Sequence, residues 1–186
     1  MSFVSVRLRS LSQKNIMKTI KIFDAKNYPP DLPVFQRSAV RAIIVRENKI
    51  LLVKSNKEWF YKFPGGGMEK GETFADTLIR ETLEEVGYPI VPSSIKEFGL
   101  IEEKRLSTVD EKQIFHQLSY FFTADVLDER CEQSLDNYEK ELGFNPEWVD
   151  IETAIRINSE FDEKYGVSFV RRDTFVLKYI WENKNV

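Results

Sequence analysis

The stretch of sequence that decides the fold is GGMEKGETFADTLIRETLEEVGY, residues 66–88 of a chain of 186 residues. Within residues 73–86 the apolar and small side chains recur with the period of a helix rather than a strand. Thr73 and Asp76, three residues apart, form a capping-box pattern, and Gly87 is typical of a helix C-terminus. The sequence therefore predicts a helix over residues 73–86.

Three glutamates share one edge of this predicted helix. At about 100° per residue, Glu81, Glu84 and Glu85 fall within an arc of about 100°, beside the apolar stripe. Carboxylates this close raise one another's pKa unless a cation neutralises them, and an all-oxygen patch suits Mg²⁺, with Mn²⁺ as a substitute. The pattern alone is also typical of an ordinary solvated face, so the spacing of the surrounding residues has to decide.

That spacing resembles a known family. The seven fixed positions of the Nudix box are all present, at Gly66, Glu72, Arg80, Glu81, Glu84, Glu85 and Gly87. At average residue frequencies, a chance match in a chain of this length has a probability on the order of one in a million. The chain thus resembles the MutT-like Nudix hydrolases, most densely over residues 60–90 and loosely over residues 38–150. Thr82 and Tyr88 depart from the family's bulky aliphatic positions.

The resemblance implies a role for each matched residue. Glu84 and Glu85 are expected to be the main metal ligands, with Glu81 as a further ligand or as the group that orients the attacking water. Gly66 is expected to lend a backbone carbonyl to the metal. The residues expected to have a structural role in the box are Gly66, Glu72, Arg80 and Gly87.

In some family members a glutamate outside the box acts as the general base. Glu141 is the candidate here, with Glu139 close behind it in the sequence. The alternative is that both belong to an ordinary solvated charge run.

Residues around the glycine run are candidates for substrate binding. Lys54, Lys57 and Lys62 flank it and are able to attract phosphates, although lysines are exposed by default, and Gly65 offers unobstructed backbone. The proposed substrate-binding set is Lys54, Lys62 and Gly65.

Aromatic residues and the single histidine have a structural and a functional interpretation. Trp59, Phe60 and Tyr61 are able to stack on a base, yet packing in the core or at the rim is the favoured interpretation. His116 lies in an apolar strand pattern and is interpreted as a packed sheet residue rather than as a catalyst.

The resemblance implies Mg²⁺-dependent hydrolysis of a phosphoanhydride bond in a nucleoside diphosphate linked to another moiety. A nucleoside triphosphate, including oxidised forms, giving a monophosphate and pyrophosphate, is the first expectation. The alternatives are ADP-ribose, a nucleotide sugar, a dinucleoside polyphosphate or an RNA end. Residues 100–110 contain neither Pro nor Tyr, so family markers of ADP-ribose or dinucleoside-polyphosphate preference are not seen. A non-catalytic nucleotide-binding regulatory module on the same fold is the competing class.

Composition limits the cellular context. A net charge of −3 disfavours long nucleic acid as a partner, and a small nucleotide fits better. With one cysteine, Cys131, and no long apolar run, we expect a cytoplasmic protein without a membrane partner, as a monomer or homodimer.

The remaining sequence predicts an α/β fold, a Nudix-type α/β/α sandwich with a mixed β-sheet between helices. We expect an N-terminal extension over residues 1–20 and a single domain over residues 21–186, with the box at residues 66–88. The expected elements are a hairpin within residues 38–53, strands at 95–101, 113–126 and 147–151, a loop at 102–111, and helices at 151–157 and 170–181.

Overall fold

The computed structural model describes residues 17–183, and most of the expected N-terminal extension lies outside them. The elements in chain order are β1 (Thr19–Asp24), β2 (Val34–Ile43), β3 (Val45–Arg46), β4 (Lys49–Ser55), β5 (Tyr61–Lys62), α1 (Phe74–Val86), the 3₁₀ turn η1 (Pro92–Ser94), β6 (Lys96–Leu106), β7 (Ile114–Thr123), α2 (Asn137–Leu142), β8 (Phe144–Asp150), α3 (Ile151–Tyr165) and α4 (Ser168–Asn183). Because β1 begins at Thr19, the boundary expected at residue 20 falls inside a strand.

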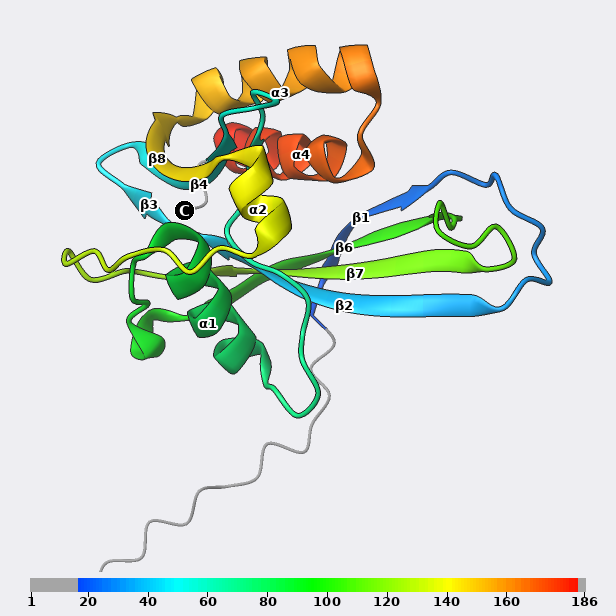
Figure 1. Cartoon of the computed structure of the whole chain (residues 1–186), viewed down its shortest axis with the longest axis horizontal. Coiled ribbons are helices and arrows are strands. Elements are labelled where there is room, and N and C mark those ends of the chain that lie inside the picture. Colours follow the sequence, from blue (N-terminus) through cyan, green and yellow to red (C-terminus); the bar gives the residue numbers. More distant parts are fainter. Residues whose placement is uncertain (1–16, 184–186) are drawn as a thin grey trace, which may run out of the picture.

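The strands form two sheets between helices, the first mixed and the second antiparallel. The first has the order β1-β6-β7-β2, with β6 and β7 antiparallel and each outer strand parallel to its neighbour. The second has β4 at its centre, paired with β3, β5 and β8. Figure 1 shows α1 on one side, α3 and α4 on the other, and the first sheet extending beyond the helices as an arm. The predicted α/β class with helices on both sides is confirmed, although the strands divide into two sheets.

The helix predicted over the box is confirmed, as α1. Its N-cap Thr73 accepts a hydrogen bond from the backbone N–H of Asp76, whose carboxylate accepts the Thr73 N–H at 2.9 Å. At the other end Gly87 has a left-handed φ of 72° and donates its N–H to the carbonyl of Leu83. A residue with a Cβ disfavours that conformation, so the glycine ends the helix where it does.

Alternation along β2 separates two cores. Val40 and Ala42 pack with Leu78 of α1, whereas Ile43 packs with Leu177 of α4. Successive side chains of a strand point to opposite faces, so one strand contacts both helical layers.

The glycine run lies against β2. The backbone N–H groups of Val40 and Ala42 donate to the carbonyls of Gly66 and Pro64, both at 2.9 Å. At Gly65, where φ is 135°, a Cβ would lie 2.1 Å from the carbonyl oxygen of Val40. This close approach requires glycine and fixes the turn that lies beside Glu81 and Glu85 of α1.

The two C-terminal helices hold the chain just before this turn. Asn158 of α3 accepts the N–H of Tyr61 at 2.7 Å and donates to its carbonyl at 2.9 Å. Asp173 of α4 accepts the N–H of Phe63 at 3.0 Å. Both polar side chains are fully buried, so their hydrogen bonds are made without competition from water.

The loop expected over residues 102–111 is partly wrong. β6 continues to Leu106, because its charged residues have strand partners on both sides and ionic partners on the helical layer. Glu103, for example, forms an ion pair of 3.0 Å with Arg172 of α4. The loop was predicted because this segment is rich in charged residues, whose partners the sequence does not show.

The expected hairpin within residues 38–53 is also shorter than predicted. β2 ends at Ile43 in the first sheet, and the hairpin of the second sheet joins β3 to β4 through Glu47 and Asn48, both with positive φ. The strand β1 and the short helix α2 were not predicted.

Candidate functional site

Glu85 is the most deeply buried carboxylate of the box. Its side chain is 2% exposed and accepts the backbone N–H of Gly65 at 2.8 Å. The ammonium of Lys62 also binds it. Burial raises the pKa of Glu85, while Lys62 and Gly65 oppose that shift. Glu85 therefore connects α1 to β5 and to the glycine turn.

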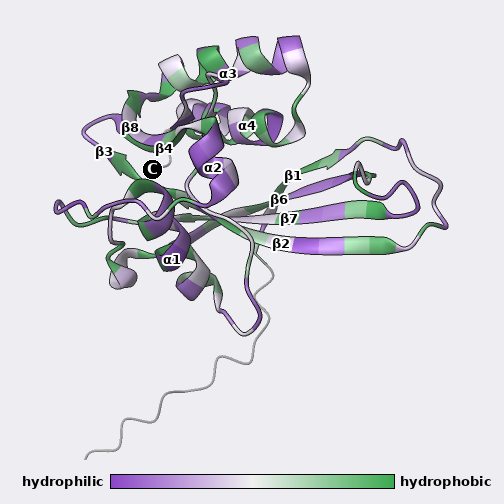
Figure 2. Ribbon diagram, viewed as in Figure 1, coloured by the Kyte–Doolittle hydropathy of each residue, from purple (hydrophilic) through white to green (hydrophobic). Residues whose placement is uncertain are grey.

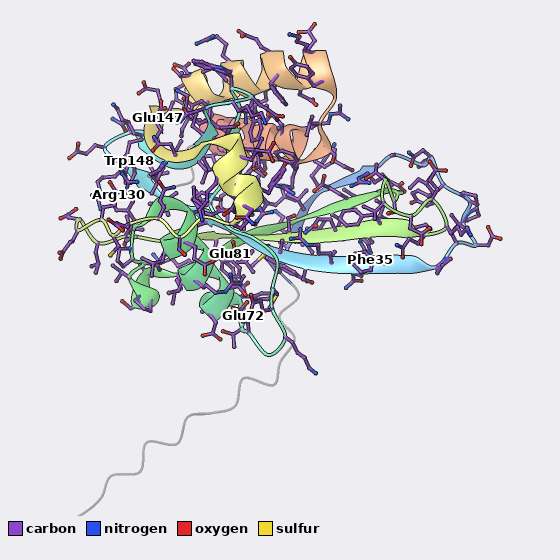
Figure 3. All side chains as sticks on the ribbon, in the orientation of Figure 1. Phe35, Glu72, Glu81, Arg130, Glu147 and Trp148 are labelled. Carbon is purple, nitrogen blue, oxygen red and sulfur yellow. The ribbon has the colours of Figure 1, made fainter. Side chains whose placement is uncertain are left out.

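Glu81 lies directly against the same turn. A Cβ on Gly66 would be 2.3 Å from both carboxylate oxygens of Glu81, so only glycine leaves room for them. Burial, and then the charge of Glu85, raise the pKa of Glu81. Figure 3 shows Glu81 facing the middle of the molecule, whereas Glu72 lies near the other end of α1.

Arg80 holds the other carboxylates of the box together. It binds Glu72 through two nitrogens at 2.6 and 2.9 Å, and its Nη1 donates to Glu81 at 2.9 Å and to Glu84 at 3.1 Å. The hydrogen bonds from Arg80 and from the backbone of Glu69 lower the pKa of Glu72 to about 2. Glu84 is more open than its neighbours, with a side chain that is 39% exposed.

The donor set of this edge suits a hard divalent cation. Within residues 17–183, no group of three or more Asp, Glu, His or Cys side chains is already gathered as a metal site. Even so, Glu81, Glu84 and Glu85 offer only oxygen ligands, and burial disfavours the charged forms of Glu81 and Glu85 until a cation compensates them.

Two glycines of the box have contacts that qualify their expected roles. The carbonyl of Gly66, expected to face a metal, accepts the N–H of Val40, which leaves it one further lone pair. Gly87 ends α1, and a Cβ there would lie 2.3 Å from the carbonyl oxygen of Cys131.

A cavity of about 290 Å³ lies on the side of α4, and the box glutamates are near it through their basic neighbours without lining it. Lys62, which binds Glu85, is one of its lining residues, and Arg41 is another. The positive charge of Arg41 lowers the pKa of both Glu81 and Glu85, against the larger effect of burial. The other positively charged lining residues are Arg37, Arg105 and Arg172.

Two of the expected substrate and base residues lie elsewhere. Lys54 forms an ion pair with Glu147 of β8 at 2.9 Å, and Glu141 forms one with Lys57 at 3.0 Å on the surface. Neither Lys54 nor Glu141 lines the cavity, whereas Glu139 does. Lys54 and Glu147 pair because β4 and β8 are neighbouring strands, which the sequence alone does not reveal.

The aromatic candidates also lie outside the cavity. Phe60 and Tyr61 are buried in the two cores, and Trp59 is 65% exposed. His116, as interpreted, is a sheet residue, with its Nε2 3.2 Å from a carboxylate oxygen of Glu102. The rings that line the cavity are Phe115, Tyr138, Phe144 and Phe169.

The arginines of the cavity were missed by the sequence interpretation. Arg37 and Arg41 follow the alternation of β2, so a signal was present as two basic residues on one face of an otherwise apolar strand. Arg105 and Arg172 come from β6 and α4, and their meeting with β2 depends on the tertiary fold.

Comparison with known proteins places this geometry in a family. A family profile described as NUDIX domain matches residues 35–169. An ADP-ribose pyrophosphatase of Methanocaldococcus jannaschii is 34% identical over 113 residues, which cover 59% of this chain and 62% of that protein. A putative ADP-ribose pyrophosphatase of Bacillus subtilis is 28% identical over 111 residues, covering 60% of this chain and 49% of that protein. The match thus spans less than two thirds of either relative.

A solved structure supports the fold. A NUDIX hydrolase from Nitrosomonas europaea, 19% identical, superposes with a TM-score of 0.55 and covers 78% of this chain and 89% of that one. None of the helices within residues 17–183 has the length and hydropathy needed to cross a membrane.

Proposed function

The chain belongs to the Nudix family, and on this basis we propose that it is a metal-dependent pyrophosphohydrolase that cleaves a phosphoanhydride bond in a nucleoside-diphosphate-linked compound. The observation that carries the proposal is the proximity of the buried Glu85 and the partly buried Glu81 to a cavity rich in arginine. The carboxylates suit a divalent cation, and the arginines of the cavity suit phosphate.

Glu81, Glu84 and Glu85 are the proposed metal ligands, with Mg²⁺ as the ion and Mn²⁺ as its substitute. When bound, such an ion neutralises phosphate charge and lowers the pKa of a water molecule that attacks phosphorus. Arg80 keeps Glu81 and Glu84 in place, and Lys62 does so for Glu85.

Glu139 is the proposed general base outside α1, in place of Glu141. It lines the cavity, and its carboxylate also caps α2 by accepting the N–H of Asp136 at 2.9 Å. That hydrogen bond fixes the position of the carboxylate, and its remaining lone pairs are able to accept a proton from water.

ADP-ribose is the first substrate to test, because two relatives carry that substrate in their names. Nucleoside triphosphates, the first expectation from the box alone, are the second substrate class to test. We also propose that the substrate is a small nucleotide and that the protein is cytoplasmic. That it is a monomer or a homodimer stays a prediction.

The test is hydrolysis of ADP-ribose, nucleotide sugars, dinucleoside polyphosphates and nucleoside triphosphates, with Mg²⁺ or with EDTA. Glu85→Gln should lower kcat/KM on the order of 10³-fold, about 4 kcal/mol of transition-state stabilisation, because a neutral amide is a poor metal ligand. Glu84→Gln, at a half-exposed position, should also lower activity with less risk to folding.

Glu160→Gln is the matched control. Glu160 is exposed on α3 and pairs with Arg156 on the same helix, so activity should not change. If the wild type and both box variants are equally inert on every substrate while remaining folded by circular dichroism, the protein is a binding module rather than an enzyme.

A further inference from the structure

The cavity beside the carboxylates holds more positive charge than its own acids neutralise. Arg172 is fully compensated, by Asp173 at 2.8 Å and Glu103 at 3.0 Å. Its role is structural, because Asp173 also holds the backbone before the glycine turn. Three other arginines of the cavity have no such compensation.

Arg37 and Arg105 are bound by neutral groups. Arg37 donates to the side-chain oxygen of Gln117 at 3.2 Å, and Arg105 donates to the carbonyl of Leu106 at 3.1 Å. The guanidinium of Arg105 also lies over the ring of Phe115, 4.6 Å from its centroid. Among the residues that the structure describes, no carboxylate forms an ion pair with either arginine.

Arg41 is the most unusual of the three. It is 7% exposed, its Nη1 donates at 3.3 Å to the carbonyl of Val40, and its Nε has no hydrogen-bond partner in the described part of the chain. Burial, and then repulsion from Arg172, lower the pKa of Arg41 to about 10, so the side chain is still charged at neutral pH. Attraction by Asp173 and Glu85 opposes this lowering only in part, so the buried charge is incompletely compensated and destabilises the folded protein, which makes a binding role the better explanation.

The position of Arg41 identifies the missing partner. It lies on β2 beside Gly65, close enough to influence Glu81 and Glu85, and it lines the cavity together with Arg37. A guanidinium fork matches the paired oxygens of phosphate, and the local surplus of charge calls for an anion. Figure 2 shows hydrophilic stretches of β2 and β7 in the middle of the arm and hydrophobic residues at its outer end.

We propose that Arg41, with Arg37 and Arg105 beside it, forms a subsite that binds a phosphate group of the substrate's diphosphate. The proposal rests on the proposed function for the identity of the ligand. The binding itself needs no hydrolysis, because the arginines are positively charged without any metal.

The test is calorimetric titration with inorganic pyrophosphate in a buffer that contains EDTA. Arg41→Met should weaken binding roughly 10- to 100-fold, because a charged hydrogen-bonding partner of the anion is lost. Arg41→Lys should bind with intermediate affinity, since it keeps the charge and loses the fork. Arg156→Met, which removes an exposed arginine on α3, should bind pyrophosphate as the wild type does.

A second readout separates binding from a structural role. Without ligand, Arg41→Met should raise the Tm by about 2–4 °C, because it removes a buried charge that the protein compensates only in part. A side chain needed for folding would give the opposite sign. Pyrophosphate should raise the Tm of the wild type and leave that of Arg41→Met almost unchanged.

The outcomes distinguish the two proposals. No binding by the wild type, or equal binding by Arg41→Met, overturns the subsite. If pyrophosphate binding depends on Arg41 while no nucleotide is hydrolysed, the subsite stands and the proposed function fails. If hydrolysis proceeds with the same KM in Arg41→Met, the subsite fails and the enzyme assignment stands.

Discussion

The acidic edge of α1 and the basic cavity beside it differ in whether their charged side chains have ion-pair partners within the protein. On the acidic side, each box carboxylate has a protein cation, either Arg80 or Lys62. On the basic side, Arg41 and its two neighbours have no carboxylate partner among residues 17–183. The acidic residues are thus held in place before any ligand arrives, whereas Arg41 is buried without an ion pair in that range and Arg37 is exposed to solvent.

This difference indicates separate roles for the carboxylates, which suit a cation, and for the arginines, which suit an anion. Rigid carboxylates favour a defined cation geometry, because their positions are set by hydrogen bonds within the protein. An uncompensated arginine instead lowers stability in the free protein and regains it when an anion binds. We therefore expect substitutions on the two sides to affect different kinetic parameters.

Gly66 and Gly67 give the sharpest comparison, because they are consecutive and contact opposite regions. An added Cβ at Gly66 meets Glu81, and one at Gly67 lies 2.7 Å from the guanidinium of Arg37. Gly66→Ala should lower kcat about 100-fold by displacing the carboxylate. Gly67→Ala should mainly raise KM, because Arg37 has to move. Steady-state kinetics on both variants would contradict this division if the two changes were alike.

Arg80→Lys tests how far the acidic edge depends on one side chain. A lysine keeps the charge but is unable to reach Glu72, Glu81 and Glu84 with a planar fork. Activity should fall about 10- to 100-fold, as is typical when a residue that orients metal ligands is lost. Mg²⁺ titration of activity is the measurement, and Arg171→Lys, at an exposed pair with Asp162, is the control.

Thr82→Val has the smallest expected effect. It tests whether a buried polar atom without a hydrogen bond has a role in binding or only destabilises the fold. In the described part of the chain, the Thr82 hydroxyl and the Arg41 Nε are the buried side-chain atoms without a hydrogen bond. Thr82 packs in the apolar interior, so the valine should stabilise the protein by about 1 kcal/mol with unchanged kinetics. Chemical denaturation measures the gain, and a loss of activity would show that the hydroxyl has a role.

The part of the fold that the sequence predicted well is the part with local signals. The capping box at Thr73 and the stop at Gly87 need only nearby residues, and α1 begins and ends beside them. The segment after Ile101 was predicted as a loop because its charges were counted without their partners. Two neighbouring strands and Arg172 keep it extended.

The parts of the candidate site that were predicted from the sequence are likewise those with local signals. The carboxylates of the box are close in sequence, so their shared edge followed from helix geometry. The cavity joins β2, β5, β6, β7, β8, α2 and α4, and no single segment contains enough of it to be recognised. Lys54 was proposed for the site on proximity in sequence, and its pairing with Glu147 depends on the late strand β8.

The hydrogen bonds from Asn158 and Asp173 to the backbone at Tyr61 and Phe63 have a consequence for biosynthesis. The box is made before α3 and α4, so the segment that leads into its glycine turn obtains its partner Asp173 only when α4 emerges. A nascent chain stalled before residue 168 would carry every box residue and Asn158 but would lack the hydrogen bond to Asp173. Full catalytic competence should therefore appear only after α4 has been synthesised, rather than with synthesis of the box.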